Sequence, residues 1–189
     1  MKRKLILLST LIAVVIIGIC YLYRNDYYKG DLYYIEKLQK QNYIQYNNEI
    51  PTPEIIKTIN YNNDLKIIFW EDKVKGVTCS IVEHFDRKWV CVGSSGFGEV
   101  RLNNLSYIEY KPLNYKLPNI YIWNSIISDN FSKIVFDNEH VFNSIKLKDN
   151  KNLIYYISKE APANIPNYVP IISFYNNDKL IKEFQSYEI

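Results

Sequence analysis

The sequence predicts a mainly β protein of the α+β class, with an N-terminal transmembrane helix, a short helix near residues 53–60 and antiparallel sheets after it. Three observations carry this prediction. Residues 5–23 contain no charged side chain. From residue 65 onward, short apolar runs typical of strands are separated by turn signals rich in Asn and Asp, about every ten residues. The chain also contains eighteen tyrosines, which favour sheets.

The first segment is expected to be an uncleaved signal-anchor in a cell membrane. Residues 5–23 have the sequence LILLSTLIAVVIIGICYLY, which spans about 28 Å as a helix, close to the thickness of a bilayer's hydrocarbon core. The basic residues at 2–4 predict that residues 1–4 form a cytoplasmic tail and that the rest of the chain lies outside. Tyr21 and Tyr23 suit the outer membrane interface.

Three other signals resemble such a segment. A cleaved signal peptide ends in small residues, whereas this segment ends Cys20-Tyr21-Leu22-Tyr23. A lipoprotein signal places a small residue before the lipidated cysteine, and here Ile19 precedes Cys20. A pilin-type signal needs a glycine cleavage site and an early acidic residue, and neither is present. We therefore expect the anchor, with Cys20 as a lipidation candidate at its outer edge.

Residues 24–50 are expected to form a stalk that leaves the membrane. Within it, Leu32, Ile35 and Leu38 recur every three residues and predict a short helix over residues 29–40. The exposed, β-rich domain is then expected to span residues 51–189, as one unit or as two small lobes of residues 51–113 and 118–189.

A short helix is expected at the start of that domain. Thr52 is a suitable cap, Pro53 fits a first helical turn, and Glu54 favours the positive end of a helix dipole. Strands follow, expected at 65–73, 77–85, 88–94, 99–113 (one or two strands), 119–128, 133–137, 141–148, 152–159, 170–176 and 179–185.

Two cysteines lie twelve positions apart on consecutive predicted strands, Cys79 and Cys91. They face each other if the connecting loop has an odd number of residues, for example residues 83–87, and a loop of even length places them out of register. Two interpretations therefore stay open. One is a disulfide, which is chemically reasonable outside the cytoplasm. The other is a pair of buried free thiols that pack as small apolar side chains.

Charge and composition exclude a nucleic-acid-binding role for the exposed domain. The net charge of the whole chain is +3, and the three basic residues at 2–4 account for it. The rest of the chain is therefore near neutral and carries no basic patch of the kind that nucleic acid requires. We expect no nucleic acid among its partners.

No catalytic, cofactor-binding or metal-ligating residues are expected. The chain has only two histidines, His84 and His140, and no spacing of ligands typical of zinc. The glycine-rich stretch 93–98 fails the G-x-S-x-G pattern because Phe97 occupies the position of the second glycine. It also lacks the Lys-Ser/Thr ending of a phosphate-binding loop, so we expect a loop between strands.

The three tryptophans, Trp70, Trp89 and Trp123, fall within predicted strands. With the many tyrosines, they are candidates for lining a groove that binds glycan or peptide. The alternative is that they pack in the core between sheets, which we favour because large aromatic side chains dominate protein interiors.

Two stretches carry a resemblance to a known group of proteins. One contains IIFWEDK, GVTCSIVE and KWVCVGSSG, and the other contains YIWNSIISDNFSKIVF and PIISFYNNDKLIKEF. Together with the anchor, they resemble small single-pass, extracytoplasmic membrane proteins of spore-forming Gram-positive bacteria. This chain departs from their pattern at Trp89, which lacks a preceding glycine, and at Ser125, which replaces a glycine. The function of that group is unassigned, so the resemblance implies location and fold only.

We therefore expect a non-catalytic, membrane-tethered module outside the cytoplasm that binds an envelope component or a protein partner. Two alternatives remain. A cell-envelope hydrolase acting on glycan by acid–base chemistry needs two carboxylates that converge in a cleft. An accessory subunit would contact another membrane protein through the anchor.

Overall fold

A computed structural model describes most of the chain: residues 2–24, 29–42, 52–72, 76–85, 88–92, 105–160 and 171–185. In this part, helices α1 (Lys2–Arg24) and α2 (Asp31–Asn42) precede twelve strands. The strands are β1 (Glu54–Asn62), β2 (Leu65–Asp72), β3 (Gly76–Phe85), β4 (Lys88–Val92), β5 (Ser106–Tyr110), β6 (Ile120–Ile127), β7 (Lys133–Phe136), β8 (His140–Val141), β9 (Asn143–Lys146), β10 (Asn152–Ser158), β11 (Ile171–Asn176) and β12 (Lys179–Gln185).

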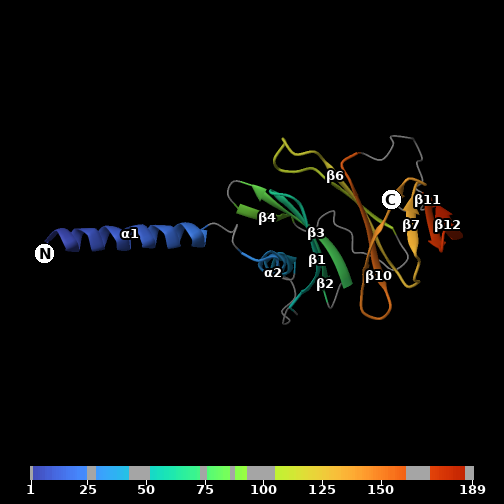
Figure 1. Cartoon of the computed structure of the whole chain (residues 1–189), viewed down its shortest axis with the longest axis horizontal. Helices are drawn as coiled ribbons and strands as arrows, with labels where there is room; N and C mark the ends of the chain where they lie inside the picture. The colour runs from blue at the N-terminus through green and yellow to red at the C-terminus, as the bar shows by residue number, and fades with distance from the viewer. Residues whose placement is uncertain are drawn as a thin grey trace.

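The strands form three four-stranded antiparallel sheets, which confirms the predicted mainly β fold class. The first sheet has the order β1-β2-β3-β4, the second β5-β6-β10-β9, and the third β12-β11-β7-β8. These sheets are stacked, with the second in the middle (Figure 1). Helix α2 covers the outer face of the first sheet, so the domain has four layers.

The N-terminal helix α1 extends away from the layered domain (Figure 1). Its described side chains run from Ser9 to Tyr21, and all of them are exposed. Within the part of the chain that the structure describes, no helix meets the length and apolarity needed to cross a membrane.

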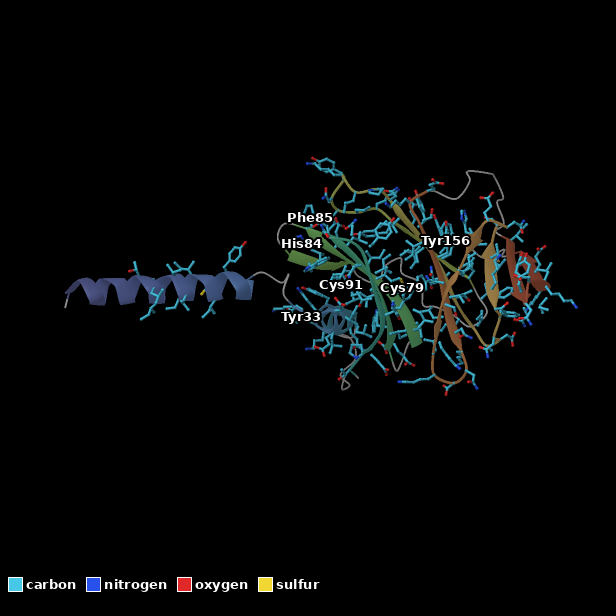
Figure 2. The ribbon with its side chains drawn as sticks, in the orientation of Figure 1. Tyr33, Cys79, His84, Phe85, Cys91 and Tyr156 are labelled. Atoms are coloured by element: carbon cyan, nitrogen blue, oxygen red, sulfur yellow. The ribbon has the colours of Figure 1, made fainter. Side chains whose placement is uncertain are left out.

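Helix α2 packs against the first sheet, although the sequence placed it in a stalk. Its buried side chains Tyr34, Ile35 and Leu38 contact a cluster that includes Trp70 and Trp89 of the sheet. Figure 2 shows the helix against the sheet, with Tyr33 at its start. The helix is therefore a layer of the domain.

Polar contacts fasten this helix at both ends. The Asp31 carboxylate accepts a hydrogen bond from Thr58 Oγ1 at 2.7 Å and pairs with Lys66 Nζ at 2.9 Å. Near the other end, Gln39 Nε2 donates to Asp72 Oδ2 at 3.1 Å. These contacts fix the direction in which the helix crosses the sheet.

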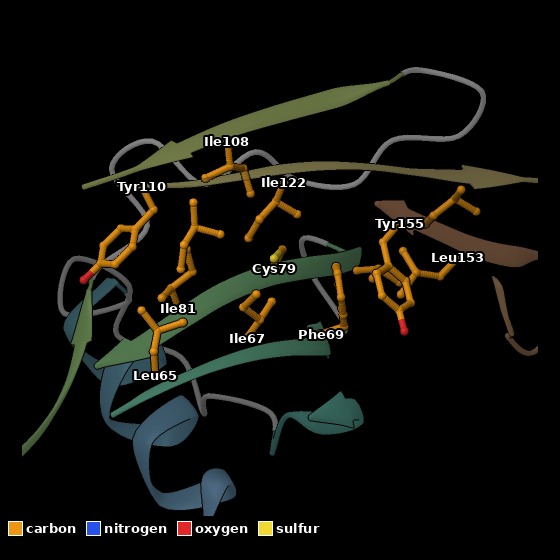
Figure 3. Packing of buried hydrophobic residues seen from close by; sticks show 13 residues of the cluster. Leu65, Ile67, Phe69, Cys79, Ile81, Ile108, Tyr110, Ile122, Leu153 and Tyr155 are labelled. Atoms are coloured by element: carbon orange, nitrogen blue, oxygen red, sulfur yellow. The ribbon is translucent and has the colours of Figure 1, made fainter. Parts of the chain in front are cut away.

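The first core lies between the first and second sheets (Figure 3). Leu65, Ile67 and Phe69 of β2 point toward Ile108 and Ile122 of the second sheet. Apolar side chains at alternating positions of a strand share one face, so the period-two pattern of the sequence builds this core directly. The core draws on both of the candidate lobes, and the seam proposed between them at residues 113–118 falls inside the β5–β6 hairpin of the second sheet.

Strand β6 is buried on both of its faces. Ile120, Ile122 and Ile126 enter the first core, whereas Tyr121 and Trp123 enter a second core between the second and third sheets. Both the even-numbered and the odd-numbered positions of β6 face a core. Its sequence is therefore a nearly continuous apolar run rather than a strict alternation of apolar and polar residues.

The later hairpins turn on pairs of Asp and Asn in the left-handed backbone region. The φ angles are 50° and 61° at Asp137-Asn138, 58° and 57° at Asp149-Asn150, and 48° and 60° at Asn177-Asp178. These two residue types tolerate this conformation better than other non-glycine residues. The Asp/Asn turn signals of the sequence therefore predicted the ends of these strands.

The short helix expected at residues 53–60 is wrong, because this segment is strand β1. It pairs with β2 in an antiparallel ladder that contains a β-bulge at Ile56. The extra residue turns Ile56 and Ile59 toward the same core, although they are three positions apart. A spacing of three on one face is typical of a helix, so the bulge made a strand look helical in the sequence.

The strand expected at residues 141–148 is two strands in different sheets. β8 pairs with β7 in the third sheet, and β9 pairs with β10 in the second. The chain crosses between the sheets at Phe142, whose side chain is buried in the second core and whose N–H donates to the Ile134 carbonyl at 3.0 Å. Of the strand expected at residues 99–113, the structure describes β5, and residues 99–104 lie outside the described part.

A buried carboxylate joins the first sheet to the second. Glu83 of β3 is fully buried and accepts hydrogen bonds from Tyr110 Oη at 2.5 Å and from the N–H groups of Leu113 and Asn114, both at 2.8 Å. Burial and the bond to Glu83 raise the pKa of the Tyr110 phenol, because the protonated phenol is the form that donates. The tie fixes the β5–β6 connection against the end of β3.

Removing the phenol hydroxyl tests this tie. We expect Tyr110→Phe to lower the free energy of unfolding by about 1–2 kcal/mol at neutral pH, because Glu83 loses a donor. The phenol of the unfolded chain ionises above about pH 10, whereas the folded phenol, with its raised pKa, stays protonated. The contribution is therefore complete below that pH and is lost as the pH rises through the folded pKa.

The measurement is urea unfolding of both proteins at neutral and at alkaline pH. The stability advantage of the unmodified chain should narrow at alkaline pH, and an advantage that stays constant would contradict this account. Tyr115→Phe is the matched control. Because Tyr115 is 88% exposed, this substitution should leave the free energy of unfolding unchanged at both pH values.

Candidate functional site

The three tryptophans do not line a binding groove. Trp70, Trp89 and Trp123 are exposed by only 2%, 5% and 2%, so this candidate role from the sequence is corrected to packing. Trp70 and Trp89 lie under α2, and the Trp70 indole donates to Ser80 Oγ at 2.9 Å. Trp123 lies between the second and third sheets, where it contacts Phe136 at 5.0 Å between ring centroids.

The candidate disulfide between Cys79 and Cys91 is not formed, and both thiols are free. In the β3–β4 hairpin Phe85 pairs with Lys88, so only two residues connect the strands, an even number. Cys91 consequently lies opposite Val82, three positions or about 10 Å along the strand from Cys79. That offset also places the thiols on opposite faces, Cys79 in the first core and Cys91 toward α2 (Figure 2).

The histidines occupy separate places. His84 Nδ1 lies 3.3 Å from Asp64 Oδ1, and its ring contacts Trp89 at 5.3 Å. His140 stacks on Tyr156 at 4.8 Å. Among the described residues, no three His, Cys, Asp or Glu side chains are grouped as a metal ion would require. The glycine-rich stretch 93–98 lies outside the described residues.

The candidate site is a groove of about 320 Å³ between one end of the first sheet and the β9–β10 hairpin of the second. We call it the inter-sheet groove. Its apolar lining consists of Ile55, Ile56, Val77, Ile126, Ile145 and Leu147. Its charged lining consists of Glu54, Glu71, Lys146, Lys148, Asp149 and Lys151. Three basic and three acidic side chains make the rim polar without a strong net charge.

Backbone pairing brings two carboxylates of this rim together. Glu54 lies directly opposite Glu71 in the β1–β2 ladder, where like charges repel. Lys148, from the β9–β10 turn, relieves that repulsion by donating to Glu54 Oε2 at 2.6 Å. The hydrogen bond to Glu54, followed by the charge of Glu54, raises the pKa of the Lys148 ammonium. All three side chains are accessible to a ligand, since those of Lys148 and Glu54 are 71% and 61% exposed and Glu71 is half-buried.

Edge strands flank the groove on both sides. β1 is the edge of the first sheet, and β9 is the edge of the second, within the described part of the chain. An edge strand offers a row of backbone N–H and C=O groups that can pair with an added extended segment. The groove therefore combines an apolar floor, charges of both signs and backbone hydrogen-bonding groups.

Sequence reasoning missed this site for two reasons. Glu54 was interpreted as the acidic residue of a helix start, which assigned it a local role. Lys148 and Glu54 are ninety-four positions apart. The only local signal was the Lys-rich turn around Asp149, because a turn between two strands must lie at the end of a sheet.

A second cavity, of about 190 Å³, opens between the second and third sheets. It is lined mainly by apolar side chains that belong to the second core, among them Ile127, Ile154 and Phe174, with Asp129 and Lys182 as its charged residues. It has fewer charged groups than the inter-sheet groove.

Comparisons with protein-family models, with curated proteins and with solved structures find no match to this chain. The resemblance to single-pass proteins of spore-forming bacteria therefore stays a prediction.

The state of the cysteines is directly measurable. Burial raises the pKa of the Cys79 thiol, and it raises that of Cys91 to about 12 against a lowering by Lys37. Both thiols are therefore protonated at neutral pH and react slowly with alkylating agents in the folded protein.

We expect the unreduced protein to add an alkyl group at every one of its three cysteines once it is unfolded in denaturant, and to leave Cys79 unmodified when it is folded. Intact-mass measurement with peptide mapping checks both results. A mass lower by two hydrogens, with Cys79 and Cys91 in one linked peptide, would show the disulfide instead.

Proposed function

We propose that this chain is a membrane-tethered module outside the cytoplasm, and that the inter-sheet groove binds an extended polypeptide segment. The observation that carries the proposal is the position of the groove between two edge strands, β1 and β9. The tether and the groove rest on different observations.

The tether rests on helix α1. Its side chains Leu11, Ile12, Val14 and Val15 are each more than half exposed, and these positions cover several sides of the helix. A helix that is apolar all round is stable when lipid or protein surrounds it, not water. The apolar stretch continues through residues 5–8 of the sequence, and the basic residues at 2–4 favour a cytoplasmic N-terminus.

The ligand class follows from the lining of the groove. The rim carries three acidic and three basic side chains, so a nucleic acid or other polyanion would meet repulsion as well as attraction and gain no net electrostatic advantage. A polypeptide carries both signs of charge, apolar side chains and a backbone that can pair with an edge strand. The groove therefore fits a protein partner better than a uniformly charged envelope polymer.

Site-specific photocrosslinking tests the proposal. A benzoylphenylalanine at Leu147, in the lining of the groove, is expected to give one discrete adduct in membranes of cells that make the protein. Lys151→Glu should weaken that adduct, because it changes the charge of the rim. The adduct is detected by gel shift and identified by mass spectrometry.

The control places the same photoreactive residue at Leu180, which is 48% exposed on β12 of the third sheet. Identical adducts at both positions would reject a specific groove. A crosslink from residue 147 to a glycan polymer, rather than to a polypeptide, would identify the ligand as an envelope component. An integral membrane protein there would favour the accessory-subunit role.

A second candidate function is a glycan hydrolase, which the Glu54–Glu71 pair favours. Directly opposite residues of adjacent strands have Cβ atoms about 5 Å apart. Flexible glutamate side chains that start at this spacing can reach the separations of about 5–9 Å that acid pairs in glycosidases use. Lys148 donates to Glu54 Oε2, so the two carboxylates have different surroundings, and this candidate assigns the role of general acid to Glu71.

This candidate predicts release of soluble sugar from purified cell wall by the full chain. Glu54→Gln and Glu71→Gln should each abolish that release, because both carboxylates are required. Glu109→Gln is the control, since Glu109 is a half-exposed carboxylate of β5 paired with Lys111 outside the groove. No release by the unmodified chain, or release by the two groove variants equal to that of the unmodified chain, would reject the hydrolase.

A further inference from the structure

Exposed apolar side chains gather at the end of the layered domain that lies opposite the inter-sheet groove. Phe85, at the end of β3, is 44% exposed, and Leu113 and Tyr115, in the β5–β6 connection, are 50% and 88% exposed. The groove contacts the other end of β3 at Gly76 and Val77. Ten residues of β3 separate the two ends, a length of about 30 Å.

Hydrogen bonds hold this connection in place. The Glu83 carboxylate binds the N–H groups of Leu113 and Asn114, and Glu83 lies on the same face of β3 as Phe85, two residues away. Within the connection, Leu117 N donates to the Asn114 carbonyl at 2.9 Å, and Lys116 N donates to Asn114 Oδ1 at 3.1 Å. The exposure of Leu113 and Tyr115 is therefore part of an ordered turn.

Basic residues accompany these apolar side chains. The Lys111 side chain is 76% exposed, and Lys116 is exposed as well. Aromatic rings with a polar tip, aliphatic side chains and lysines form the composition that partitions to the interface between lipid tails and headgroups. Anionic headgroups attract lysines close to the surface. We call Phe85, Lys111, Leu113, Tyr115 and Lys116 the apolar-basic surface.

The chain enters the domain at this same end. Asp31, the first residue of α2, binds Lys66, whose ammonium lies 5.0 Å from the centre of the Trp89 ring. The Trp89 ring contacts His84, the residue before Phe85. Only residues 25–30 lie between α1 and α2, a span of at most about 20 Å. A membrane that holds α1 would therefore lie within reach of this end.

We propose that the apolar-basic surface docks onto the lipid headgroup region of the membrane that holds α1, with Tyr115 and Leu113 entering the interface. The proposal rests on the tether proposed above. Docking orients the domain with β3 rising from the membrane, so the inter-sheet groove faces away from the lipid and is open to a partner.

Tryptophan fluorescence in the full chain tests the docking. The three native tryptophans are buried, so a tryptophan introduced in place of Tyr115 reports on its own surroundings. Tyr115→Trp and the control Leu180→Trp are reconstituted into vesicles of phosphatidylcholine with a minor share of phosphatidylglycerol, with and without bromine on the lipid acyl chains. Leu180 belongs to β12 of the third sheet, and this strand lies on the side of the domain away from α1 (Figure 1).

We expect the added emission of Tyr115→Trp to shift to shorter wavelength and to be quenched by brominated lipid, and that of Leu180→Trp to show neither effect. Co-flotation of the protein with the vesicles is measured in the same samples. If both variants float and neither is quenched, the tether stands and the docking is rejected. If neither floats, the tether fails and the docking fails with it. Protection of the introduced indole of Tyr115→Trp from aqueous iodide, without quenching by brominated lipid, would assign the surface to a protein neighbour and reject lipid docking.

Discussion

The structure depends on one constraint, the burial of strand β6 of the second sheet on both of its faces. All eight residues of β6 are buried, and its apolar residues contribute alternately to the core between the first and second sheets and to the core between the second and third sheets. A strand in this position is expected to be apolar on both faces, because water reaches neither. The polar exceptions in β6 are Asn124 and Ser125, and the amide atoms of the fully buried Asn124 have no hydrogen-bond partner within the described part of the chain. Such a group is costly, so the surrounding packing must offset it.

The polar ties at Glu83 and Asp31 join segments that the hydrophobic cores alone would leave free to slide. Glu83 fixes the β5–β6 connection to β3, and Asp31 fixes α2 to β1 and β2. Buried or partly buried carboxylates act well in this role because their bonds are directional and expensive to leave unmade. Both ties lie at the same end of the domain: Glu83 holds the connection that carries Leu113 and Tyr115, and Asp31 holds the start of α2 close to it.

The proposed roles use opposite ends of the same strand. β3 begins at the inter-sheet groove and ends at Phe85, so a domain docked through Phe85 would hold the groove about 30 Å from the lipid. Strands resist bending within a packed sheet, which would make the distance between membrane and ligand constant. The edge strands β1 and β9 contribute to the lining of the groove, together with residues of the interior strands β2, β3 and β6.

Features that depend on neighbouring residues could be predicted from the sequence. Alternating apolar residues placed most of the strands, and pairs such as Asp137-Asn138 and Asn177-Asp178 placed the turns, because left-handed backbone is a local preference. The remaining features depend on contacts between distant segments. The bulge at Ile56 gave β1 the apolar spacing of a helix. At Phe142 the chain crosses between sheets, so one predicted strand is two strands. The two-residue hairpin connection places Cys79 and Cys91 out of register. The candidate site belongs to this second group, since Glu54 meets Lys148 across ninety-four positions, and no local pattern encodes a contact between residues so far apart.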